Sequence, residues 1–244
     1  IPFIRTRTTM PEASFIVAQA VTLAVTVAAA RAFTSFDGIV DALGFYGVYH
    51  SNPTNQLIHF FGVPFIAWSM TLFLCMLEIP FVGPVKLPTW AGSRLTWALP
   101  FLLLYVAGYV NLDPVGGGLY TLVMYFMYLT SAHWVTMDQK KAQLASKQTN
   151  KYSKIHWYGT GQLLKLALLF HIGSWYVQIH PGHMIYEGAR PAVLDSVGGA
   201  ITSAPLFAFY EGLWYLGLHK EMQQQTLAKV AENLARICAE GTVQ

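Results

Sequence analysis

The chain has 244 residues, of which 54% are hydrophobic and 11% are charged, and its formal net charge is +3. The mean hydropathy of +0.41 excludes a disordered chain, because disorder requires low hydrophobicity and high charge. So few charges argue against an ordinary soluble domain, and the small net charge argues against a partner made of nucleic acid. Two cysteines cannot form a disulfide scaffold or a thiolate zinc site.

Long segments free of charged residues predict about six apolar helices. A bilayer core about 30 Å thick requires roughly 20 mostly apolar helical residues, and these runs do not alternate as barrel strands do. The predicted helices lie near residues 13–33, 55–77, 95–112, 117–137, 161–180 and 195–218. We read the first as a retained membrane helix and not as a signal peptide, because it is long and Arg31 follows it. The third is short, and we expect it to form a hairpin with the fourth.

We expect residues 1–244 to form a single membrane-embedded domain. Its expected fold class is all-α, a polytopic bundle of membrane helices. Residues 219–244 predict a polar, amphipathic helix, since apolar residues recur there with a helical period. Lysines between the fourth and fifth helices place that loop on the cytosolic side by the positive-inside rule. We therefore expect residues 34–54 and 180–194 to share the opposite face.

The first candidate site lies around His50 and His59. Asn52 followed by Pro53 predicts a helix start, with a side-chain cap and then a proline whose missing N–H costs nothing. A bend at this cap would bring both imidazoles to one point, and Asn55 shares a helix face with His59. The alternative is a capped helix with two buried, hydrogen-bonded histidines.

The second candidate site lies in residues 178–192, where His183 and Glu187 are four residues apart. Imidazole and carboxylate together suit non-haem iron. Glu187 could instead pair with Arg190, or orient a ligand imidazole through a hydrogen bond. His180 precedes a proline and a glycine, so it is either a ligand or a turn histidine.

Other polar residues within apolar segments carry weaker hypotheses, because ionisable groups there usually face a partner or a cavity. Glu211 is expected to be paired or neutral, and it could hydrogen-bond a site histidine. His171 is expected to be a core histidine bonded to a neighbouring helix. Tyr46 and Tyr49 are typical of interfacial aromatic belts. Phosphate loops, nucleophile elbows and paired-histidine boxes are absent from the sequence.

Two separate motifs occur in this chain in the same order as in the 2-hydroxy fatty acid dioxygenase family, and the chain resembles that family. Its members are small multi-helix membrane proteins, formerly classed as a domain of unknown function. The first motif is Phe45-Tyr46-x-x-Tyr49-His50-x-Asn52-Pro53-x-Asn55-x-x-Ile58-His59, followed by Gly62-Val63-Pro64. The second comprises Trp175, Gln178, Gly182-His183, Tyr186-Glu187, Arg190-Pro191-Ala192, Asp195, Ala204-Pro205, Glu211 and Leu216-Gly217. The resemblance covers residues 43–218. Residues 1–36 look like an extra N-terminal helix, and His180-Pro181 looks like an insertion.

The resemblance implies an Fe(II) enzyme of the endoplasmic reticulum membrane that uses O2 to shorten long-chain 2-hydroxy fatty acids by one carbon. This is the alpha-oxidation route that consumes acids derived from phytosphingosine. The implied metal ligands are His50, His59 and His183, with Glu187 or His180 as the next candidate, and Glu187 is also a catalytic candidate. The implied substrate contacts are Arg190, Tyr46 and Tyr49. The residues expected to support the histidines are Asn52, Asn55, Gln178 and Glu211.

Two other functions remain open from the sequence. A membrane carrier of lipid or metal could use the histidines as a path for protons or metal ions, although the two halves show no convincing repeat. A lipid hydrolase could use zinc-activated water. The sequence gives no oligomeric state.

Overall fold

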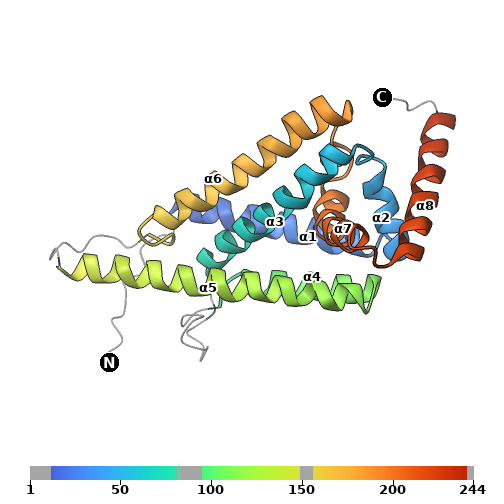
Figure 1. The fold of residues 1–244 in the computed structure, drawn as a ribbon. Helices are drawn as coiled ribbons and strands as arrows, with labels where there is room; N and C mark the ends of the chain where they lie inside the picture. Colours follow the sequence, from blue (N-terminus) through green and yellow to red (C-terminus); the bar gives the residue numbers. More distant parts are fainter. Residues whose placement is uncertain (1–11, 81, 83–94, 149–155, 241–244) are drawn as a thin grey trace.

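The computed structural model describes residues 12–80, 82, 95–148 and 156–240, and this part of the chain is all-helical, as expected (Figure 1). The α-helices are α1 (Ala13–Phe33), α2 (Ile39–Gly47), α3 (Pro53–Met76), α4 (Ala98–Leu112), α5 (Gly116–Gln148), α6 (Gln162–Val177), α7 (Val197–Tyr215) and α8 (Lys220–Ala239). A π-helical segment, η2 (Gln178–Glu187), and a short 3-10 turn, η3 (Ala192–Leu194), lie between α6 and α7.

Helix α3 is the centre of the arrangement. It packs against α6, α5, α7 and η2, while α4 and α5 form an antiparallel hairpin beside it (Figure 1). Helix α1 packs on α7, and α8 covers α2. One buried apolar cluster joins α1, α2, α4, α5 and α7, and a second joins α3, α4, α5 and α6.

The helix starts follow from local chemistry. The Asn52 side chain caps α3 by accepting hydrogen bonds from the backbone N–H groups of Thr54 and Asn55, as the sequence predicts. The hairpin turn between α4 and α5 lies at residues 113–115, between the helices predicted near 95–112 and 117–137. The Asp113 carboxylate accepts hydrogen bonds from Val115 and Gly116 at the start of α5.

Two of the described helices, α1 and α3, are long and apolar enough to span a membrane. Helix α1 has 21 residues and a hydropathy of 1.9, and α3 has 24 residues and a hydropathy of 1.8. Helix α4 is apolar but shorter. Length and composition therefore indicate a membrane association and do not by themselves give a six-span bundle.

Three segments differ from the expected helices. The 34–54 stretch contains α2, a nine-residue helix too short to show a clear helical period. Helix α5 continues to residue 148, about two turns into the basic segment. The helix expected to end at residue 180 changes at Gln178 into η2, which contains Pro181. Because proline has no N–H to donate, a regular α-helix cannot pass through this position undisturbed.

Candidate metal centre and its cavity

Three buried histidines from distant segments meet in one place. His50 lies between α2 and α3, His59 lies in the second turn of α3, and His183 lies in η2. Their exposed fractions are 3%, 5% and 2%. The ring centroids are separated by 4.4 Å (His50 to His59), 4.8 Å (His50 to His183) and 4.9 Å (His59 to His183), and one nitrogen of each lies within 4.8 Å of the others.

Backbone carbonyls fix the tautomers of two of these rings. Nδ1 of His50 lies 2.9 Å from the backbone oxygen of Tyr46, and Nδ1 of His59 lies 2.9 Å from that of Asn55. A carbonyl can only accept, so each Nδ1 carries the proton and each Nε2 keeps a free lone pair. Among the described residues, His50 Nε2 and His183 Nδ1 are buried without a hydrogen-bond partner.

The surroundings keep these rings neutral. Burial lowers the pKa of His50 well below its ordinary value, and the neighbouring His59 lowers it further. Burial also lowers the pKa of His183. Neutral imidazoles are the form that binds a metal ion, and orphaned nitrogens converging on one point fit such an ion. This donor set suits iron, zinc, copper or nickel, so it supports a metal without selecting one.

Glu187 lies outside the three-histidine group and braces the start of α3. Its carboxylate accepts hydrogen bonds from Ser51 N (2.7 Å), Ser51 Oγ (2.5 Å), Asn52 N (3.1 Å) and Asn55 Nδ2 (2.9 Å). Burial alone would raise the pKa of Glu187, but these hydrogen bonds outweigh burial and lower it. These contacts also place Ser51 and Asn52, at the end of the 34–54 segment, beside Glu187 of the 180–194 segment. Because donors surround both oxygens, Glu187 makes neither of the contacts that the sequence left open, an ion pair with Arg190 or a direct hydrogen bond to a ligand imidazole.

Two further expected site residues lie elsewhere. His180 is exposed and stacks on Tyr176, with ring centroids 5.4 Å apart, so it does not join the other histidines. Arg190 pairs with Asp195 at 2.6 Å and not with Glu187. Tyr49 donates a hydrogen bond to the same Asp195 carboxylate at 2.9 Å. These contacts tie the segment before α7 to the end of α2.

Two of the residues expected to support the histidines, Asn55 and Gln178, lie beside them, and so does Tyr46, which was expected to contact the substrate. Tyr46 is buried and stacks on His50 at a centroid distance of 3.8 Å. Asn55 is fully buried and joins Glu187 to His59 through its side chain and its carbonyl. Gln178 is buried and lines the same cavity as the histidines.

Close backbone approach explains two glycines of the motifs. A Cβ at Gly182 would lie 2.6 Å from Asn55 Oδ1, and a Cβ at Gly62 would lie 2.6 Å from Gln178 Nε2. At both positions an added side chain would force the facing side chain or the backbone to move. The glycines therefore allow η2 to press against α3, which brings His183 to His59.

Glu211 on α7 is buried, with an exposed fraction of 5%, and neither carboxylate oxygen has a hydrogen-bond partner among the described residues. Burial raises the pKa of Tyr46 well above its ordinary value, and Glu211 raises it further. The structure thus shows no hydrogen bond from Glu211 to a site histidine.

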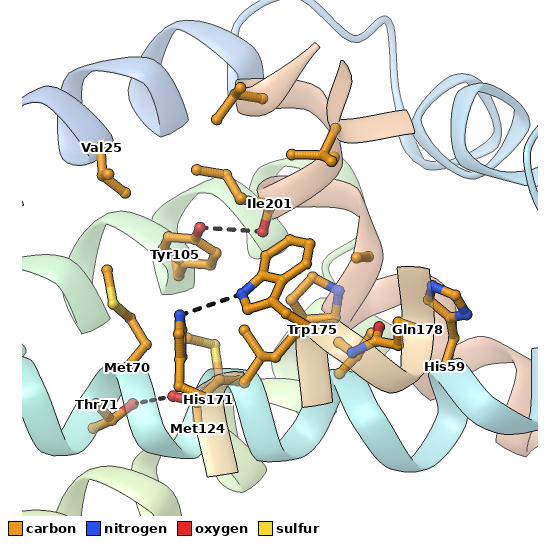
Figure 2. Close-up of a pocket in the computed structure, with 18 of the residues that line it drawn as sticks. Val25, His59, Met70, Thr71, Tyr105, Met124, His171, Trp175, Gln178 and Ile201 are labelled. Atoms are coloured by element: carbon orange, nitrogen blue, oxygen red, sulfur yellow. Dashed lines mark hydrogen bonds between the residues drawn. The ribbon is translucent and has the colours of Figure 1, made fainter. Parts of the chain in front are cut away.

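An apolar cavity of about 260 Å³ opens beside the three-histidine group and extends between α3 and the neighbouring helices. Figure 2 shows His59 at one end of this stretch of α3, with Met70 and Thr71 toward the other end. Val25 of α1 and Tyr105 of α4 point toward the same space (Figure 2).

His171 in the cavity wall is the core histidine that the sequence predicts. Trp175 Nε1 donates to its Nε2 at 3.2 Å, so its Nδ1 carries the proton and donates to Ser69 Oγ at 2.9 Å. Ser69 in turn donates to the backbone oxygen of Ile66. Both ring nitrogens are therefore occupied.

Comparison with known proteins gives the family. The family profile described as "2-hydroxy-palmitic acid dioxygenase Mpo1-like" matches residues 36–213. The chain belongs to the Mpo1-like family. The 2-hydroxy-palmitic acid dioxygenase MPO1 of Saccharomyces cerevisiae is 29% identical over 184 residues, which cover 74% of this chain and 84% of the yeast protein. No solved structure matches the chain.

The Mpo1-like segment contains all three buried histidines, Glu187 and Glu211. It begins after α1 and ends within α7, so α1 and α8 lie outside it. The family resemblance read from the two motifs is therefore confirmed.

Sequence reasoning missed part of the site. Phe207 of α7 packs beside the histidines, with ring centroids 6.0 Å from His50 and 4.7 Å from Tyr46. The cavity walls on α4 and α5 were also missed. An isolated aromatic residue in an apolar run gives no signal of its neighbours, since only tertiary packing brings these helices to α3.

Proposed function

We propose that this chain is an Fe(II)-dependent dioxygenase that cleaves long-chain 2-hydroxy fatty acids to the fatty acid one carbon shorter. The observation that supports this most is the three-histidine group, which lies at one end of an apolar cavity in a chain of the Mpo1-like family. The yeast relative is named for its action on 2-hydroxy-palmitic acid, which supports a lipid substrate.

His50, His59 and His183 would hold the metal. When bound, Fe(II) would supply the one-electron chemistry that O2 needs in order to react with a closed-shell organic molecule. Three protein ligands leave coordination positions open, as oxygen-using iron sites require. The carbonyl hydrogen bonds of Tyr46 and Asn55 keep two rings in the tautomer that presents Nε2.

The cavity would receive the apolar tail, and the histidine end would receive the polar head. Among the described residues that line it, none is a lysine or an arginine, so a bound metal is the positive charge available to a substrate carboxylate. The apolar walls would keep water from the reacting carbons, which would strengthen electrostatic interactions there. If the lost carbon leaves as CO2, the reaction balances: one 2-hydroxy acid and one O2 give one shortened acid, one CO2 and one H2O.

A membrane location fits this substrate. Helices α1 and α3 have the length and hydropathy of membrane spans, and much of their apolar surface is exposed. Further crossings by the remaining apolar segments would make the protein multi-pass, and the endoplasmic reticulum is the membrane that we expect. A long-chain acid would then reach the cavity from the lipid phase.

A zinc-dependent lipid hydrolase is the second candidate, because the same three-histidine donor set also suits zinc. Three histidines with an open fourth position also suit catalytic zinc, which activates a bound water. Metal analysis separates the two functions, because a hydrolase would retain activity with zinc and without O2.

The deciding experiment is anaerobic purification in detergent, followed by loading with Fe(II) or Zn(II). O2 uptake on addition of 2-hydroxypalmitate is then measured, together with the masses of the products. Iron-dependent uptake that yields the fifteen-carbon acid is expected. Folded, iron-loaded protein that consumes no O2 would contradict the proposal, and binding of the lipid without turnover would then favour a carrier.

A further inference from the structure

The cavity follows one face of α3. The residues of α3 that line it after His59 are Val63, Ile66, Ala67, Met70, Thr71 and Leu74. They recur every three or four positions, so they form a single stripe along the helix. With a rise of 1.5 Å per residue, the distance along the axis from His59 to Leu74 is about 22 Å. The cavity therefore extends along α3 from the histidines to Leu74, and we call this part of the cavity the channel.

The far end of this channel is formed by packed core residues. Leu74 of α3, Ala98 and Leu102 of α4 and Tyr128 of α5 line the cavity, and all four are buried. They belong to the apolar cluster that joins α3, α4, α5 and α6. Close-packed interiors accommodate added volume poorly, so we expect this end of the channel, its floor, to be rigid and closed to a longer ligand.

The side walls differ from the floor. Met70, Met124 and Met127 line the cavity, and methionine is a flexible side chain that fills irregular gaps. The polar groups of His171 are occupied by Ser69 and Trp175, so they offer no site for a polar group on a tail. The channel therefore constrains the length of a ligand more strictly than its width.

We propose that Leu74, Ala98, Leu102 and Tyr128 act as a ruler that selects the chain length of the fatty acid. One acyl chain spans about half of a hydrocarbon core roughly 30 Å thick, or about 15 Å. This length, with the polar head added, fits a channel of about 22 Å. Ala98 is the smallest of the four, so its side chain leaves the space that the last carbons of the tail occupy. The identity of the head group in this inference rests on the proposed function. The limit on the length of the tail rests on the cavity alone.

The test measures binding and needs no turnover. The full chain in detergent, without added metal, is loaded with a fluorescent long-chain fatty acid, which saturated acids of twelve to twenty carbons then displace. Each methylene that fits contributes about fourfold to affinity, so affinity should rise with length and then stop rising. In Ala98→Leu this limit should move to shorter acids, and the longest acids should lose at least tenfold in affinity. Ala98→Val, which adds less volume, should move the limit less.

The matched control is Ala107→Leu, the same substitution on an exposed position of α4. It should leave the length profile unchanged. Leu102→Ala should move the limit toward longer acids. If neither Ala98 variant folds, the length profile of Leu102→Ala alone tests the proposal. Equal loss of affinity at all lengths, or an unchanged profile in the folded variants, would overturn the ruler. A shifted profile in a protein that consumes no O2 would uphold the ruler and refute only the proposed reaction.

Discussion

The side-chain amide of Asn55 donates a hydrogen bond to Glu187 at 2.9 Å, across 132 residues of sequence. The backbone carbonyl of the same Asn55 accepts the Nδ1 proton of His59. One residue therefore connects the carboxylate that braces the start of α3 to a candidate metal ligand. The position of His59 depends on contacts that lie outside the histidine group.

Glu187→Gln should weaken both the fold and the metal site. The amide removes the charge and turns an N–H group toward donors, and hydrogen bonds to charged groups contribute about 1.5–3 kcal/mol each. We expect a loss of about 2–3 kcal/mol in the free energy of unfolding, with metal affinity lowered about 10–100-fold through the displaced His59. Chemical denaturation and metal titration measure the two effects. Glu221→Gln on the exposed first turn of α8 is the control, and equal stability of the two variants would contradict the role of Glu187.

The pH dependence of stability should carry the signature of Glu187. Its pKa in the folded chain is lowered from an ordinary value of 4.5. The carboxylate therefore stabilises the fold fully above about pH 4.5, and this contribution is lost as the pH falls through the lowered folded pKa. The stability difference between the natural chain and Glu187→Gln should be constant from pH 7 to about pH 5 and should shrink below that. Unfolding curves at several pH values test this, and a difference that does not change with pH would contradict it.

The sequence predicts elements whose signals are local. The long apolar runs predict the helices, and Asn52-Pro53 predicts the start of α3, because caps depend on neighbouring residues alone. The three histidines are also found from sequence, since ionisable groups beside apolar helices stand out and the two motifs contain them. This much of the site could be predicted before any packing was known.

The parts that depend on packing could not be predicted. The partner of Arg190 is Asp195, a nearby carboxylate that competes successfully with Glu187. The role of Glu187 depends on donors more than 130 residues away, which no helical spacing reveals. The change from α6 to η2 at Gln178 alters which side chains share a face, and π-helical segments have no simple period in sequence.

Gly182→Ala should disrupt the candidate metal centre. The new Cβ would lie 2.6 Å from Asn55 Oδ1 and 3.5 Å from Cε1 of His59, so either the buried Asn55 side chain or η2 would have to move. We expect a destabilisation of about 1–3 kcal/mol and loss of metal binding. Gly173→Ala in α6 is the control, because its Cβ meets nothing within 4 Å and alanine favours a helix. Unfolding and metal content of both variants are compared, and similar behaviour of the two would show that the close approach at Gly182 is unimportant.

The metal ligands can be separated from the other histidines by single substitutions. His59→Ala and His183→Ala each remove one of the three buried nitrogens, so we expect bound iron to fall below about a tenth of the natural level and O2 uptake to fall with it. His180→Ala is the matched control, because His180 lies in the same η2 segment as His183 but is exposed and stacked on Tyr176. It should retain both iron and turnover. Iron content is measured by elemental analysis of protein whose fold has been checked by circular dichroism. Loss of iron in His180→Ala, or full retention in the other two variants, would show that the metal is held by a different set of residues.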